Sequence, residues 1–161
     1  MFLKIYTLVH VLLSLIGIGS GLVVMYSMLT RKRVAGWTAT FLATTVATSA
    51  TGFGFPFHGW TPGLTIGALS LVLLAFAIVA LYRYQLAGSW RWIYVITATL
   101  SLYFNVFVLI VQSFEKVPFL NAIAPTQSEP PFALTQPLVL AFFFVLGVLG
   151  VIRSRMQIQA R

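Results

Sequence analysis

The sequence has no cysteine, no aspartate and very little charge of either sign. Two glutamates are its only acidic residues, and charged residues make up 7% of the 161-residue chain. The absence of cysteine excludes disulfides, thiol catalysis and cysteine-ligated metal sites. The absence of aspartate leaves no such residue to orient a histidine for nucleophilic hydrolysis. The composition therefore favours a non-enzymatic protein.

Apolar residues make up most of the chain. The hydrophobic types make up 60% of the chain, and its mean hydropathy is +0.98. Soluble domains carry about 25% charged residues, and a body this small cannot hide so many apolar side chains from water. The composition predicts an integral membrane protein. The net charge of +8 is then a topology signal, and we expect no nucleic-acid partner.

Five apolar runs are long enough to be transmembrane helices. A helix needs about 20 mostly apolar residues to cross the bilayer, and the runs cover residues 5–29, 37–55, 61–83, 92–114 and 132–152. The one long connection, residues 115–131, is rich in proline and contains a segment, residues 117–125, that predicts a short helix lying on the membrane. We expect an all-α bundle of five transmembrane helices forming a single domain over residues 1–161.

The basic residues predict the orientation of this bundle. If the connections alternate sides, the side with the N-terminus holds Lys4 and Lys116. The opposite side holds the other eight basic residues: Arg31, Lys32, Arg33, Arg83, Arg91, Arg153, Arg155 and Arg161. Because loops rich in lysine and arginine stay in the cytoplasm, we expect the N-terminus outside and the C-terminus inside. The predicted location is a cell membrane, the bacterial inner membrane, crossed several times.

Polar residues within the apolar runs repeat at helical spacing. In the first run His10, Ser14, Gly17 and Gly21 follow at intervals of four, three and four. In the fourth, Ser101, Asn105 and Gln112 share one face. An unpaired amide in an apolar medium costs about 2–7 kcal/mol, so these amides must face partners. The partners are expected among the hydroxyls of the second run or in a bound molecule.

These stripes predict a polar cleft between the first, second and fourth runs. The cleft is expected to open outward, with the proline-rich connection as its lid. The same stripes also fit simple helix packing, and the spacing alone leaves that alternative open. The candidate ligand-binding residues are His10, Ser14, Thr44, Thr48, Thr51, His58, Trp60, Ser101, Asn105 and Gln112.

Such a cleft favours the polar head of a small amphipathic molecule, a quinone or a lipid, with its tail in the bilayer. The protein would then serve as an accessory subunit of a membrane complex, or as a homo-oligomer. A first alternative is an oligomeric channel or transporter for a small neutral solute, because hydroxyl and amide linings suffice for such a path. A second is a redox protein that binds haem b through His10 and His58. No other metal site is predicted.

Overall fold

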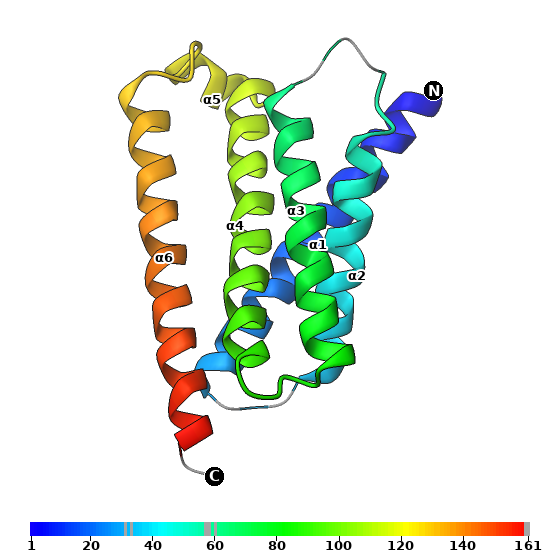
Figure 1. The fold of residues 1–161 in the computed structure, drawn as a ribbon. Coiled ribbons are helices and arrows are strands. Elements are labelled where there is room, and N and C mark those ends of the chain that lie inside the picture. Colours follow the sequence, from blue (N-terminus) through cyan, green and yellow to red (C-terminus); the bar gives the residue numbers. More distant parts are fainter. Residues whose placement is uncertain (31, 33, 57–58, 60, 160–161) are drawn as a thin grey trace.

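The computed structural model describes residues 1–30, 32, 34–56, 59 and 61–159, with side chains up to residue 155. Every regular element in this part of the chain is helical (Figure 1). The elements are α1 (Phe2–Thr30), α2 (Ala35–Gly52), α3 (Pro62–Ile78), a π-helical turn η1 (Val79–Arg83), α4 (Trp90–Lys116), α5 (Pro118–Ile123) and α6 (Pro130–Gln159). The predicted all-α class is confirmed.

Four helices are long and apolar enough to cross a bilayer. They are α1, α3 extended by η1, α4 and α6, with 22 to 29 residues and mean hydropathies of 2.0 to 2.7. Their ends follow from local sequence. Pro62 occupies the first turn of α3, where its missing N–H costs nothing, and the Thr61 hydroxyl accepts a hydrogen bond from the Leu64 N–H. These four helices fit a multi-pass membrane protein.

The second predicted span, α2, is a helix but a less apolar one. It has 18 residues, of which seven are threonine or serine. Threonine in a helix returns its hydroxyl to a carbonyl one turn earlier, as Thr44 does to the carbonyl of Thr40 at 2.7 Å. This bonding lets a hydroxyl-rich helix lie within apolar surroundings. The expected count of five transmembrane helices stays a prediction, because α2 is not among the four.

Helices α1 to α4 form a four-helix bundle, and α6 lies outside it. α1 packs along α2, α2 along α3 and α3 along α4, while α6 contacts α4 and α1 (Figure 1). Only 6% of the most apolar stretch of α6 is buried. The start of α1 and the end of α6 lie at opposite ends of the molecule (Figure 1). Five helices, α1, α2, α3, α4 and α6, alternate in direction, and this odd number explains that arrangement.

Two glycines of α1 allow a close crossing in the bundle. A Cβ atom on Gly21 would lie 2.7 Å from Leu102 Cδ1 of α4 and 2.9 Å from Phe41 Cδ2 of α2. One turn earlier, a Cβ on Gly17 would lie 3.0 Å from the hydroxyl oxygen of Thr45. The GxxxG pair therefore packs α1 against two helices at once, as small residues do in membranes.

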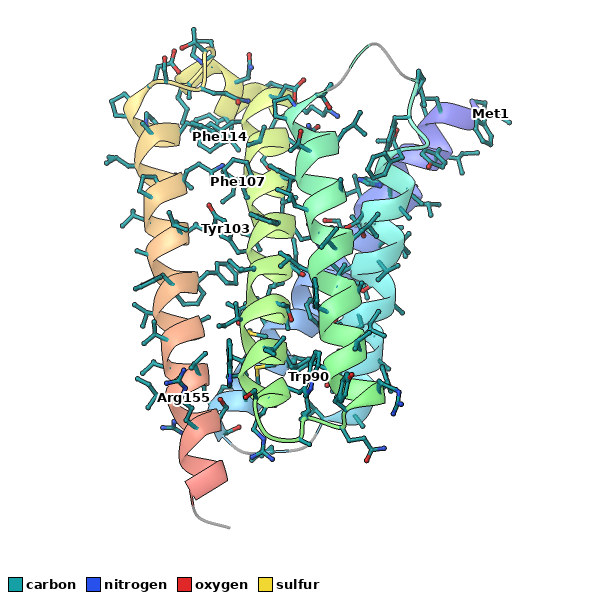
Figure 2. The ribbon with its side chains drawn as sticks, viewed as in Figure 1. Met1, Trp90, Tyr103, Phe107, Phe114 and Arg155 are labelled. Carbon is teal, nitrogen blue, oxygen red and sulfur yellow. The ribbon has the colours of Figure 1, made fainter. Side chains whose placement is uncertain are left out.

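Charge separates between the two ends of the bundle. Lys32, Arg83, Arg91 and Arg155 lie at or near helix termini at the end opposite Met1, where Figure 2 shows Arg155 close to the level of Trp90. Glu115 and Glu129 flank the connection at the other end. Arg31, Arg33 and Arg161 fall outside the described residues. The separation agrees with the sequence pattern, whereas the direction of the bundle across a membrane stays a prediction.

The proline-rich connection differs from the expected lid. It contains the predicted short helix, α5, but none of residues 117–131 lines the cleft described below. The Asn121 amide donates to the Phe114 carbonyl at 3.3 Å, and the Gln127 amide donates to the Val111 carbonyl at 3.2 Å. These bonds hold the connection on α4, and the ring of Phe132 packs against Phe114. The expectation that this connection closes the cleft was therefore wrong.

A second set of hydrogen bonds organises the end of the connection. The Glu129 carboxylate accepts from the Thr126 hydroxyl at 2.9 Å and from the Thr126 N–H at 3.2 Å. Desolvation raises the pKa of the Glu129 carboxyl, but the hydrogen bonds to its oxygens lower that pKa by more. The pKa of Glu129 therefore lies below its ordinary value. Because the pKa is lowered in the folded chain, this turn loses its stabilisation only as the pH falls through that pKa.

Candidate ligand-binding cleft

A cavity of about 360 Å³ lies between α1, α2, α3 and α4. It runs from Lys116 near the end of α4 inward to Asn105, a distance of about 16 Å along a helix. Its walls are mainly apolar, with Phe53, Leu64 and Phe104 among them. This is the end of the bundle where the N-terminus lies. The volume falls within the range of small-molecule sites.

His10 stands on the α1 wall in a defined orientation. Its Nδ1 lies 2.8 Å from the Thr51 hydroxyl oxygen, and that hydroxyl lies 2.7 Å from the Ala47 carbonyl. Thr51 has one hydroxyl hydrogen and gives it to the carbonyl, so the N–H of neutral His10 is at Nδ1. Its Nε2 is therefore a hydrogen-bond acceptor. The ring also packs edge-on against Phe55, with 5.2 Å between centroids.

Tyr6 fixes the same end of α1 to α2. Its hydroxyl donates to the Thr51 carbonyl at 2.7 Å, and its ring packs edge-on against Phe55 with 5.0 Å between centroids. Gly54 leaves room for this contact, since a Cβ there would collide with the Tyr6 hydroxyl oxygen. The Thr51 carbonyl also accepts from the Gly54 N–H at 3.0 Å, so Tyr6 adds a second hydrogen bond at the end of α2. Thr51 thus anchors both Tyr6 and His10.

Ser14 and Asn105 join α1 to α4 at the inner end of the cavity. The Ser14 hydroxyl donates to Asn105 Oδ1 at 2.7 Å, and Asn105 Nδ2 donates to the Ser14 carbonyl at 3.4 Å. Both residues are buried and both line the cavity. The amide of Asn105 therefore has the partner that its place in an apolar helix requires.

Three polar side chains line the cavity without a partner. Ser49, Ser70 and Gln112 make no side-chain hydrogen bond to any other described residue. Lys116 adds an ammonium group at the outer rim. Polar groups within an apolar wall are costly unless they are hydrogen-bonded or hydrated. The cavity therefore presents hydrogen-bonding groups that the described residues leave unpaired.

The structure brings together half of the residues expected from the sequence. His10, Ser14, Thr48, Asn105 and Gln112 line the cavity, and Thr51 supports His10 from behind. Thr44 and Ser101 do not line it, and their hydroxyls donate to the carbonyls of Thr40 and Thr97 in their own helices. His58 and Trp60 lie outside the described residues.

Sequence reasoning missed the wall that α3 provides. Gly63, Gly67 and Ser70 line the cavity together with Leu64 and Ile66. The first three follow at intervals of four and three, a stripe of small residues that marks a close helix contact. That stripe was the available signal. Its two glycines have no polar side chain, so the pattern of polar residues does not mark it as part of a cleft.

Thr45 has a buried hydroxyl that no described residue pairs with, 1% exposed. We expect Thr45→Val to raise the stability of the protein by about 1 kcal/mol, because valine keeps the shape and removes an unpaired polar group. The midpoint of thermal unfolding in mild detergent measures the effect. Thr48→Val is the matched control, since the Thr48 hydroxyl donates to the Thr44 carbonyl at 2.8 Å. Equal shifts in both variants would show that the Thr45 hydroxyl is not a local defect.

Metal ligands are sparse around the cleft. No group of three His, Cys, Asp or Glu side chains occurs among the described residues. His10 Nε2 is one nitrogen that could serve as an axial ligand of haem, and the second expected ligand, His58, is outside the described part of the chain. No protein-family model, curated protein or solved structure matches this chain. The geometry of the cleft is therefore the basis for the function proposed below.

Proposed function

We propose that this membrane protein binds a small amphipathic molecule, a quinone or a lipid, with its polar head in the cleft and its tail toward the bilayer. The observation that supports this most is the combination of apolar walls with hydrogen-bonding groups that have no partner among the described residues, Ser49, Ser70 and Gln112. A molecule that is polar at one end and apolar along its length matches both features. No ionised side chain is needed to hold it.

The available atoms suit a ring that carries oxygen. The Gln112 amide can donate to a quinone carbonyl, and His10 Nε2 can accept from the hydroxyl of the reduced quinol. The Ser49 and Ser70 hydroxyls reach the same cavity from α2 and α3. Lys116 at the rim can instead meet the phosphate of a lipid head. Both ligand types fit one cleft, and chemical identification of the bound molecule separates them.

The placement in the membrane is part of the proposal. We take α2 as the fifth transmembrane helix, because it runs alongside α1 within the bundle. The cationic end of the bundle then faces the cytoplasm and the cleft faces outward. An accessory subunit of a membrane complex needs a surface that contacts other subunits. The largely exposed apolar side of α6 provides such a surface.

The first experiment identifies what the purified protein carries. The protein is extracted in mild detergent, its absorption spectrum is recorded, and its organic extract is analysed by mass spectrometry. A quinone or a single lipid species near one per chain supports the proposal. A haem absorption band lost in His10→Ala favours the redox alternative instead. A colourless protein without a bound molecule overturns the proposal and directs attention to solute flux in liposomes.

Substitutions in the cleft locate the binding site. We expect Gln112→Leu and His10→Leu each to lower the retained ligand at least about tenfold, because each removes a hydrogen-bonding group from an apolar wall. Mass spectrometry measures the ligand per mole of folded protein. Gln136→Leu is the matched control, since Gln136 lies on α6 outside the cleft and its amide donates to the Phe107 carbonyl. Unchanged retention in all three variants would assign the polar stripes to helix packing.

A further inference from the structure

A second hollow lies between α4 and α6, away from the cleft. It has a volume of about 420 Å³ and is bordered by Leu100 and Tyr103 of α4 and by Phe144 and Val148 of α6. Figure 2 shows Tyr103 in the space between these helices. The hydroxyl of Thr99, which also borders the hollow, already donates to the sulfur of Met25 at 3.2 Å. This groove is therefore almost purely apolar.

The groove leads to a cation at the basic end of the bundle. On α6, Phe144, Val148, Val151 and Arg155 follow at intervals of four, three and four, so they share one helical face. On α4, Trp92 lies one turn before the groove residue Ile96. The Arg155 guanidinium lies over the Trp92 ring, 6.0 Å from its centroid. This pair lies one helical turn beyond the groove residues Ile96 and Val151.

Arg155 has no carboxylate side chain as a partner. The two glutamates of the chain, Glu115 and Glu129, flank the connection at the opposite end of the bundle. Arg153, two residues away, instead points to α1, where its guanidinium donates to the Leu29 carbonyl. A guanidinium held over an aromatic ring by a cation–π contact keeps its N–H groups available for bidentate bonds to phosphate. The end of the groove thus combines apolar depth with an available cation.

We propose that this groove binds one anionic phospholipid, with an acyl chain between α4 and α6 and its phosphate on Arg155. The groove borders the largely exposed helix α6, so acyl chains are what surrounds it in a bilayer. The cation at its end then selects a lipid with net negative charge, because basic pockets between transmembrane helices recognise such head groups. This lipid site is separate from the cleft in both place and chemistry.

The test compares lipid retention in matched arginine variants. The purified full-length protein is incubated with phosphatidylglycerol or phosphatidylcholine of the same acyl chains, and bound lipid is counted by native mass spectrometry. We expect the protein to retain phosphatidylglycerol in preference. Arg155→Gln should lower that retention about fivefold, the effect of one basic residue on anionic lipid binding. Arg155→Lys should restore part of it.

Arg153→Gln is the control, because it removes the same charge from the face of α6 that points to α1. It should change retention less than about twofold, because the Arg153 guanidinium is held by the Leu29 carbonyl of α1. Equal losses in the two glutamine variants, or no preference for phosphatidylglycerol, would overturn the proposal. So would cross-links that place a second chain or another protein over the groove. Gln112→Leu should leave phosphatidylglycerol binding unchanged, which separates this result from the outcome at the cleft.

Discussion

Gly21→Leu is expected to destabilise the protein by about 3 kcal/mol or more. A Cβ atom at this position would already lie 2.7 Å from Leu102 Cδ1 and 2.9 Å from Phe41 Cδ2, and Phe41 and Leu102 are both completely buried. Leucine adds further carbons to a crossing of three helices that is already in close contact. Overpacking of this kind costs about 1–3 kcal/mol even where side chains can shift. Here two fully packed neighbours leave no direction for the shift.

The measurement is thermal unfolding in mild detergent, followed by circular dichroism and by size-exclusion chromatography. Gly19→Leu is the matched control, because Gly19 lies on the same helix and a Cβ atom there would meet no other atom within 4 Å. It should unfold close to the temperature of the original protein. If the two variants unfold together, the loss would come from glycine replacement in general, and the tight crossing at Gly21 would be refuted.

Asn105→Leu is expected to destabilise the protein by about 1–3 kcal/mol and to enlarge the apolar share of the cleft. The substitution removes the acceptor of the Ser14 hydroxyl and leaves a buried donor without its partner. Hydrogen bonds between membrane helices are worth about 1 kcal/mol each, and Asn105 exchanges hydrogen bonds with both the side chain and the carbonyl of Ser14. The unfolding midpoint measures the loss.

A double-mutant cycle with Ser14→Ala isolates the pair. If the two side chains act through their mutual hydrogen bonds, the double variant should lose less than the sum of the single variants. Asn121→Leu serves as the control, because Asn121 makes its hydrogen bonds to carbonyls at the end of α4, outside the cleft that Ser14 lines. Its effect should add to that of Ser14→Ala. Additive losses for the Asn105 pair would show that the two side chains do not stabilise the bundle through each other.

Helix packing and ligand binding compete as explanations of the same polar residues, and the structure separates some of them. Thr44 and Ser101 bond to their own helices, and Ser14 with Asn105 joins two helices. Packing therefore accounts for much of the stripe that the spacing revealed. Gln112 is the exception, since it lines the cavity and no described residue pairs with it. For this reason Gln112 is the most informative position in the proposed cleft.

The cavity is lined by the three helices expected for the cleft and also by α3, which was not expected. The stripe of His10 and Ser14 identified the face of α1, and Asn105 with Gln112 identified the face of α4. α3 supplies its wall mainly through small and apolar residues, such as Gly67 and Ile66. Such residues occur on every face of a membrane helix, so their pattern does not distinguish a cavity from a lipid contact.

The expected lid shows a different limit of the sequence. Prolines in the connection correctly indicated a defined backbone, including the short helix α5. The prolines do not indicate, however, which helix the connection packs against. The side-chain amides of Asn121 and Gln127 donate to carbonyls of α4, and these hydrogen bonds hold the connection on that helix. A long-range hydrogen bond of this kind has no signature in local spacing.

The sequence by itself determined the class of this protein, the positions of its long helices and the separation of its charges. These features depend on composition and on periods of a few residues, which act locally along the chain. Only the tertiary structure decided that α6 stands outside the bundle, that α3 completes the cleft and that Thr51 orients His10. Those outcomes depend on which surfaces fit at close range, as at Gly21, and packing of that kind joins residues far apart in the sequence.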